Sequence, residues 1–195
     1  MMTVVAAKII WLLGIVAWYA IRYPFQRHAA KNGVARSAGG TGDRVALTIS
    51  AIGQFVVPAI YVVSGQPAFA DYPFQPPLTW LGLVVLIAAL ALFRVTHKQL
   101  GRNWSVTLET RTRHELVTDG LYGYVRHPMY SSFLLLAIAQ ALLLPNWVAG
   151  LSGIVGIAVL FFYRIDKEEA LMTESFGDEY RAYMRRTARI VPWLY

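Results

Sequence analysis

The chain has 195 residues, 56% of them hydrophobic and 15% charged, and the charged share lies well below the ~25% usual in soluble domains. It carries a net charge of +7 and no cysteine, which excludes disulfides, thiolate metal sites and a cysteine nucleophile. The basic residues follow no nucleic-acid-binding motif, so the positive balance points to membrane topology and lipid contact. The apolar residues fall in long blocks, which predicts a polytopic membrane protein.

Three apolar blocks in the first half predict transmembrane helices. They cover residues 4–21, 45–63 and 78–96. Residues 22–44, between the first two blocks, form a basic loop, whereas residues 64–77 contain no Lys or Arg. Pro58 lies inside the second block and predicts a kink there.

A second group of apolar segments follows a long polar connection at residues 97–127. These segments cover residues 131–144 and 147–163. The turn between them, Pro145-Asn146, is so short that they must form an antiparallel helical hairpin. Pro128 suits the first turn of the hairpin's first helix. Residues 164–189 predict a charged, helical C-terminal tail that Gly177 breaks.

Lys and Arg crowd the first loop, the long connection and the tail, and they are absent from the second loop and the hairpin turn. The positive-inside rule then predicts five transmembrane helices, with the N-terminus outside and the C-terminus in the cytoplasm. We therefore expect an all-α, multi-pass membrane fold whose last two spans form a hairpin, followed by a cytoplasmic C-terminal helix. In a prokaryote this would be a protein of the cell membrane.

Ionisable groups gather at the predicted cytoplasmic end. Arg164 and Glu168 are four residues apart and share a helix face, and we expect that face to lie near His127. Arg126 and His127 precede a helix start, where free N–H groups and the helix dipole favour an anionic or strongly polar ligand. Arg164 suits a carboxylate, and Glu168 suits sugar hydroxyls. The competing interpretation is an ordinary helix boundary and a surface ion pair.

A metal site is not expected. His97 and His114 are the two residues that could suggest one, but their spacing fits no zinc pattern and no third ligand is evident.

The second half contains five short motifs, which are His-Glu-Leu-Val at 114–117, Gly-Leu-Tyr at 120–122, Arg-His-Pro-Met-Tyr at 126–130, Glu-Glu at 168–169 and Phe-Gly-Asp-Glu-Tyr at 176–180. In this order and spacing they resemble the integral-membrane isoprenylcysteine carboxyl methyltransferases. The resemblance runs from about His97 to the C-terminus, while the first three spans match only in hydropathy. The short length and five spans are similar to those of the small prokaryotic members.

The resemblance implies S-adenosylmethionine as methyl donor and the α-carboxylate of a prenylated cysteine as acceptor, in contact with the lipid bilayer. It implies that Arg164 orients the substrate carboxylate. The cofactor-binding residues that it implies are His114, Glu115, Leu116, Val117, Tyr122, His127, Pro128, Met129, Tyr130 and Glu168. Residues 1–96 would then hold the first three spans, and residues 97–195 the cofactor-binding and catalytic region.

Other functions fit parts of the same pattern. One is a membrane methyltransferase acting on another lipophilic acceptor, such as a phospholipid amine, or on a small thiol. An amine must lose a proton, and His127 is the evident general base for that step. The architecture is also similar to that of membrane sterol reductases, which bind a nicotinamide cofactor. A lipid-binding scaffold or transporter subunit would leave the Arg164–Glu168 cluster unexplained.

The predicted topology is testable because the chain has no cysteine of its own. Single cysteines at Ser64 and Ser37 would be treated with a membrane-impermeant thiol reagent. We expect the cysteine at position 64 to react in intact cells and the one at position 37 only after permeabilisation. The reverse pattern would contradict the five-span topology.

Overall fold

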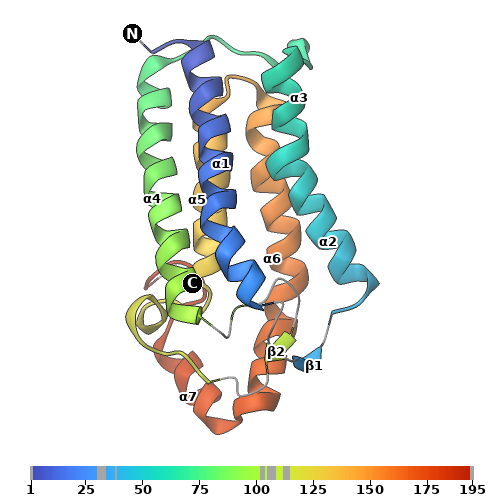
Figure 1. The fold of residues 1–195 in the computed structure, drawn as a ribbon, viewed down its shortest axis with the longest axis vertical. Coiled ribbons are helices and arrows are strands. Elements are labelled where there is room, and N and C mark those ends of the chain that lie inside the picture. Colours follow the sequence, from blue (N-terminus) through green and yellow to red (C-terminus); the bar gives the residue numbers. More distant parts are fainter. Residues whose placement is uncertain are drawn as a thin grey trace.

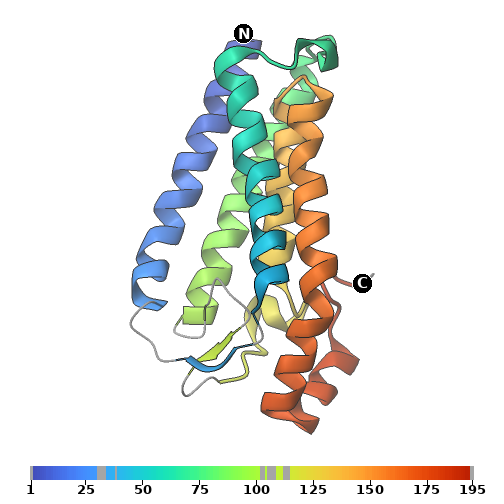
Figure 2. The same cartoon turned by 90° about the vertical axis from the view of Figure 1, so that its right-hand side faces the viewer.

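The structure is a computed structural model that describes residues 2–29, 34–37, 39–101, 104, 109–111 and 115–193. Long helices lie side by side in one bundle, and the last helix lies beyond one end of this bundle (Figures 1 and 2). The bundle helices are α1 (Val4–Ala29), α2 (Thr41–Ala51), α3 (Val57–Ser64), α4 (Pro76–Leu100), α5 (Pro128–Leu143) and α6 (Trp147–Phe176), and the last helix is α7 (Asp178–Arg186). The predicted helical fold class is therefore confirmed.

One small antiparallel sheet was not predicted. It pairs β1 (Val34–Ser37) with β2 (Glu109–Arg111). These strands belong to the first loop and to the long polar connection. The sheet lies at the same end of the bundle as α7 (Figure 1), so two segments far apart in the sequence meet at that end.

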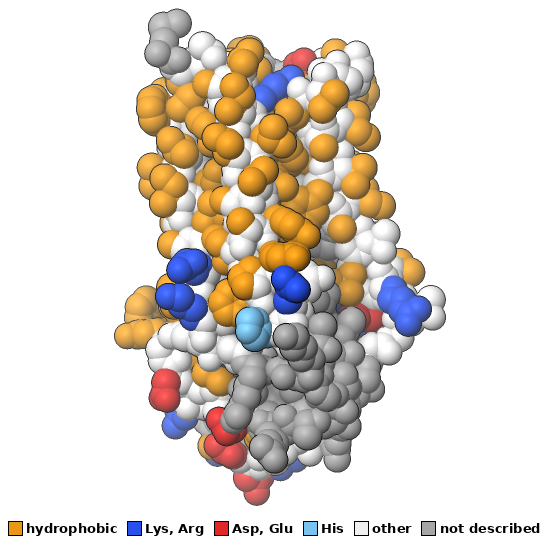
Figure 3. All heavy atoms as spheres, in the orientation of Figure 1, with side chains coloured by type: hydrophobic (Ala, Val, Ile, Leu, Met, Phe, Trp, Pro, Cys, Tyr) orange, Lys and Arg blue, Asp and Glu red, His pale blue; other side chains and the backbone are white. Residues whose placement is uncertain are grey.

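Four helical stretches are long and apolar enough to cross a membrane. They are Val4–His28, Thr41–Ser64, Pro76–Leu100 and Trp147–Phe176. Apolar side chains cover the visible sides of the bundle, and most of the charged ones gather toward the α7 end (Figure 3). The chain is therefore an integral, multi-pass membrane protein. Helix α5 has 16 residues, fewer than the ~20 that usually span a bilayer.

Helix α5 is the centre of the bundle, because it packs against both α4 and α6. Leu136, Ala137 and Ala139 are buried there among apolar side chains. Gln140 is also buried, and its Nε2 donates to the carbonyl oxygen of Ala149 at 2.8 Å. Its Oε1 accepts a hydrogen bond from Gln54 at 3.2 Å. These bonds satisfy a polar side chain that would otherwise be costly among apolar neighbours.

Between α2 and α3 the helix changes its hydrogen-bond pattern. Residues Ile52–Val56 form a π-helical turn, and the N–H of Val57 bonds to the carbonyl of Ile52. Pro58 follows directly, and because proline has no N–H, an irregular turn before it leaves fewer backbone bonds unmade. The irregularity predicted at Pro58 is thus a π-turn just before it.

Helix α6 is longer than the apolar segment from which it was predicted. It continues through the charged residues that follow residue 163 and ends at Gly177, whose φ is +57°, a value that glycine adopts without strain. Because the helix does not break at the end of its apolar part, it holds Arg164 and Glu168 on one continuous helix.

The close packing of the π-helical turn Ile52–Val56 against α6 generates a stability prediction. A Cβ on Gly53 would overlap the backbone carbonyl of Ser152, whereas a Cβ on Gly40 would meet nothing within 4 Å. We expect Gly53→Ala to destabilise the protein by about 1–3 kcal/mol, the usual cost of overpacking. Gly40→Ala is the matched control. Thermal unfolding in detergent measures both, and equal melting temperatures for the two variants would contradict the close packing.

Candidate functional site

A cavity of about 560 Å³ lies inside the bundle toward the end that carries α7. Helices α1, α2, α5, α6 and α7 all contribute to its wall. Part of the lining is apolar and aromatic, including Trp18, Phe55, Phe133 and Leu160. Another part is charged and comprises Arg22, Arg126, His127, Arg164 and Glu168. A cavity with one apolar and one charged lining suits a ligand that has both characters.

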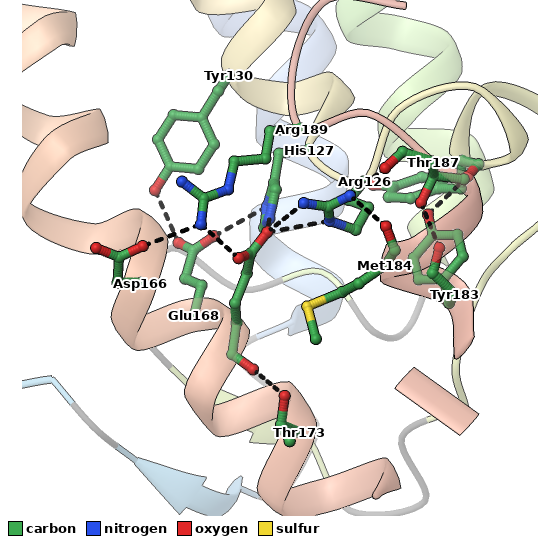
Figure 4. A network of polar contacts seen from close by, with 12 residues as sticks. Arg126, His127, Tyr130, Asp166, Glu168, Thr173, Tyr183, Met184, Thr187 and Arg189 are labelled. Atoms are coloured by element: carbon green, nitrogen blue, oxygen red, sulfur yellow. Dashed lines mark hydrogen bonds and ion pairs between the residues drawn. The ribbon is translucent and has the colours of Figure 1, made fainter. Parts of the chain in front are cut away.

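Glu168 is the acidic side chain of this lining, and it receives three polar contacts. The hydroxyl of Tyr130 donates to its Oε1 at 2.8 Å. Nδ1 of His127 lies 3.4 Å from its Oε2, and Nε of Arg164 lies 3.5 Å from its Oε1. The contacts of Tyr130 and His127 are drawn in Figure 4. The structure therefore brings together Arg164, Glu168 and His127, which the sequence placed near one another.

Arg164 has a second acidic neighbour that sequence analysis missed. Its Nε lies 3.0 Å from Oδ1 of Asp43, in the first turn of α2. The side chains of both residues are less than 10% exposed. Such a buried contact favours one fixed orientation of the Arg164 guanidinium, because leaving either charge unpaired would be costly.

Glu169, the neighbour of Glu168 in sequence, faces a different set of cations. Its carboxylate lies 2.9 Å from Nη2 of Arg126 and 2.9 Å from Nη2 of Arg189, while Nε2 of His127 is 3.5 Å away. Arg126 was expected at a helix mouth that could bind an anion. The structure instead gives it a carboxylate partner within the protein.

Residues 187–190, called the C-terminal segment below, are joined to the loop before α5 by hydrogen bonds as well as by the ion pairs of Glu169. The N–H groups of Arg126 and His127 donate to the carbonyl oxygens of Ala188 and Arg189, at 2.8 and 2.9 Å. The guanidinium of Arg126 also donates to the carbonyl of Thr187. The chain end is thus held against the loop that supplies His127 to the cavity.

The electrostatics of His127 follow from its two carboxylate neighbours. Burial lowers the pKa of His127, but contacts with Glu168 and Glu169 and their negative charges outweigh burial, so the pKa is raised above its usual value. The charged imidazolium is therefore favoured, and it is a donor at both nitrogens. In this state His127 is poorly suited to accept a proton from an amine.

Most of the residues in the expected cofactor pocket line this cavity. They are Leu116, Val117, Tyr122, His127, Met129, Tyr130 and Glu168, and Arg164 lines it as well. Pro128 is buried in the first turn of α5 beside them, and Glu115 is exposed and outside the lining. His114 lies outside the described residues. Within the described ranges, no group of three or more His, Asp or Glu residues could hold a metal ion.

Several residues of the cavity lining were not predicted from the sequence, and most of them lie in segments where hydropathy was the main signal. Trp18, Arg22 and Gln54 belong to the first two membrane helices, and Trp104 belongs to the long connection. The tyrosines of α7, Tyr180 and Tyr183, also face the cavity. For these residues the sequence offered one signal of a role in the site. Gln54 is a polar residue inside an apolar block, and polar residues within membrane helices often mark functional positions.

Comparison with known proteins gives a consistent result. The sequence model described as the isoprenylcysteine carboxyl methyltransferase family matches residues 80–174. A protein-S-isoprenylcysteine O-methyltransferase of Schizosaccharomyces pombe is 38% identical over 96 residues, which make up 48% of this chain and 41% of that protein. Protein-S-isoprenylcysteine O-methyltransferase B of Arabidopsis thaliana is 30% identical over 141 residues, or 68% of this chain and 72% of that protein.

A solved structure is also similar. It is the eukaryotic intramembrane Ras methyltransferase (isoprenylcysteine carboxyl methyltransferase), with a TM-score of 0.53 and 23% identity over 77% of this chain and 52% of that chain. At this identity the likeness shows the fold alone. The match spans about half of the solved chain and less than half of the Schizosaccharomyces pombe protein.

The contacts of Glu169 generate a prediction about the C-terminal segment. In Glu169→Gln, the buried Arg126 and the partly exposed Arg189 lose a shared carboxylate. Removing one member of a buried ion pair such as Arg126–Glu169 costs about 3–5 kcal/mol. We expect amide hydrogen exchange at residues 187–190 to accelerate. Glu179→Gln, which changes an exposed acid on α7, is the control and should leave exchange as in the wild type. Unchanged protection in Glu169→Gln would show that Glu169 does not hold the segment.

Proposed function

The chain belongs to the isoprenylcysteine carboxyl methyltransferase family, and we propose that it transfers a methyl group from S-adenosylmethionine to the α-carboxylate of a prenylated cysteine. The observation that supports this most is the cavity with a charged lining at Glu168, His127 and Arg164 and an aromatic lining at Trp18 and Phe55. An acceptor of this kind needs both, because it joins a carboxylate to a lipid chain. A volume of about 560 Å³ lies within the usual range of small-molecule sites.

The reaction asks little acid–base chemistry of the protein. A carboxylate oxygen forms a bond to the methyl carbon while the bond between that carbon and the sulfonium sulfur breaks, and no proton is removed. The protein must therefore align donor and acceptor and exclude water. Opposite charges disappear as the methyl group moves, so a site of low polarity favours the transition state. A buried cavity inside the bundle suits these requirements.

The residues of the charged lining fit the proposed methyl donor. When bound, S-adenosylmethionine supplies an activated methyl group on a positively charged sulfur. Glu168 offers the carboxylate oxygens that sugar hydroxyls donate to, and Tyr130 and His127 hold that carboxylate in place. We propose Leu116, Val117, Tyr122 and Met129 as the remaining lining of the donor site, together with His114, Glu115 and Pro128 from the sequence pattern.

Arg164 is the proposed catalytic residue. Its place in the cavity wall, one helical turn before Glu168, suits a guanidinium that orients the acceptor carboxylate. Asp43, 3.0 Å from its Nε, would fix that orientation. Asp43 also offsets the charge of Arg164, so the nucleophile is positioned without being strongly stabilised in the ground state.

The aromatic lining is the proposed site of the prenyl chain. Trp18 and Phe55 meet with ring centroids 4.9 Å apart and come from α1 and from the π-turn after α2. Both helices contribute lining residues, so we propose that the lipid chain reaches the cavity from the bilayer between them. Residues 97–195 remain the proposed donor-binding and catalytic region, and residues 1–96 supply much of the apolar wall.

For the membrane arrangement we keep the five predicted spans, with the short helix α5 as the fourth of them in chain order. At ~1.5 Å per residue its 16 residues reach about 24 Å, so the bilayer would have to thin locally around it. The end of the bundle that carries α7 would face the cytoplasm, with the N-terminus outside. This places the charged cavity lining at the side from which a water-soluble methyl donor arrives.

The protonation of His127 argues against the amine acceptor that the sequence left open. Deprotonating an amine needs a base near the methyl group. The raised pKa of His127, caused by Glu168 and Glu169, favours its protonated form. A carboxylate acceptor needs no such base.

The donor assignment is testable on purified protein in detergent. Glu168→Ala should weaken S-adenosylmethionine binding about tenfold or more, since a hydrogen bond to a charged group contributes about 1.5 kcal/mol or more. Calorimetry measures the affinity, and Glu174→Ala, an exposed acid on the same helix, is the control. The wild type should methylate an S-farnesylcysteine analogue with labelled donor. Unchanged donor affinity in Glu168→Ala would remove Glu168 from the site, and methylation of amine or thiol acceptors alone would refute the carboxylate assignment.

A further inference from the structure

Arg22, on α1, lies in the wall of the cavity and was not part of the expected site. Its guanidinium carbon lies 5.1 Å from the ring centre of Trp18 and 5.2 Å from that of Trp104. These are cation–π distances. An aromatic ring accepts no conventional hydrogen bond, so these contacts leave the N–H groups of the guanidinium available to a hydrogen-bond acceptor.

The other basic side chains of the described cavity wall already have carboxylate partners. Arg126 is paired with Glu169, and His127 contacts Glu168 and Glu169. Arg164 is paired with Asp43. These acids offset much of the positive charge that three of the lining cations would present to a bound anion.

Arg22 is different in this respect. Within the described part of the chain, its guanidinium contacts the two tryptophan rings, and no Asp or Glu there lies within ion-pair distance of it. A cation in surroundings of low polarity gains most from an anion that enters them. Arg22 is thus the lining cation whose charge is not already offset by an acid of the described protein.

We propose that Arg22 binds the negatively charged oxygen group of the methyl acceptor, which is the α-carboxylate of a prenylated cysteine. The assignment of that acceptor rests on the proposed function. Trp18 would have two roles, a cation–π contact with Arg22 and a place in the apolar lining next to it. The carboxylate and the start of the lipid chain would then be recognised by neighbouring residues of one helix.

This arrangement also separates substrate from product. The acceptor enters as an anion and leaves as an uncharged ester, so methylation removes the charge that Arg22 attracts. The ester is held by its lipid chain alone, which favours its release. Arg164, offset by Asp43, would align the carboxylate, while Arg22 would provide the net attraction for it.

The simpler role for a basic residue near a helix end is to reach lipid phosphates at the membrane surface. Arg27, on the same helix, fits that role, since it is exposed and lies 5.6 Å from the ring centre of the exposed Tyr23. Arg22 is half-buried and faces the cavity. The two arginines are therefore a matched pair for an experiment.

The test compares two ligands that differ in charge alone. N-acetyl-S-farnesylcysteine carries the carboxylate, and its carboxamide has nearly the same shape without the charge. Binding of each would be measured for the wild type, Arg22→Gln, Arg22→Lys and Arg27→Gln in an uncharged detergent that contains no lipid phosphate. S-adenosylmethionine binding would be measured in parallel to show that each variant is folded.

We expect the wild type to prefer the acid over the amide by about tenfold or more, as a charge-assisted hydrogen bond would give. In Arg22→Gln the ratio should fall to near one, in Arg22→Lys it should be partly kept, and in Arg27→Gln it should equal that of the wild type. Binding of S-adenosylmethionine should be unchanged in all of them.

Three results would overturn the proposal. One is a wild type that binds acid and amide equally. Another is an Arg22→Gln variant that keeps the preference, above all if Arg164→Gln loses it. The last is an Arg22→Gln variant that keeps the preference but loses affinity for added phosphatidylglycerol, which would make Arg22 a lipid-headgroup site. A separate outcome concerns the proposed function. If the wild type prefers the acid and Arg22→Gln loses that preference, but the wild type transfers no methyl group to the acid, the proposed function fails and the binding role of Arg22 stands.

Discussion

Glu169 and Arg126, 2.9 Å apart, hold together the two parts of the chain from which the charged end of the cavity is built. Arg126 immediately precedes His127, and it also binds carbonyl oxygens of the C-terminal segment. Glu169 adds Arg189 from that segment. One buried carboxylate thus fixes the loop before α5, helix α6 and the chain end relative to one another. Together with the backbone hydrogen bonds of Arg126 and His127 to Ala188 and Arg189, this constraint holds His127 next to Glu168.

The two adjacent acids of α6 have separate tasks because consecutive helical residues point in different directions. Glu169 faces the protein's own cations and is 8% exposed. Glu168 faces the cavity and is held by Tyr130, His127 and Arg164. A fixed carboxylate at the wall of a cavity is suited to binding a ligand, since no reorganisation is required when the ligand arrives. The fixed geometry of Glu168 therefore depends on the contacts of Glu169.

Local patterns in the sequence predicted the parts of this structure that depend on local physics. Long apolar blocks gave the helices, Pro128 marked the start of α5, and the spacing of Arg164 and Glu168 put them on one face. Asp43 was not predicted, because its partner lies more than a hundred residues away and no periodicity connects them. For the same reason the sheet of β1 and β2 and the return of residues 187–190 to the loop before α5 were missed. The helical continuation of α6 through its charged part, up to Gly177, was predicted, but the ion pairs of Glu169 with Arg126 and Arg189 were not, because no local pattern connects these residues.

The central claim is that this one cavity holds the methyl donor next to the acceptor, with Glu168 on the donor's side. A structure of the protein with bound S-adenosylhomocysteine, the demethylated product of the proposed donor, tests it most directly. The account predicts that the ribose hydroxyls lie within hydrogen-bond distance of Glu168 and that the sulfur faces the part of the cavity lined by Arg164 and Arg22. Product bound elsewhere on the protein, or with its ribose away from Glu168, would contradict the account.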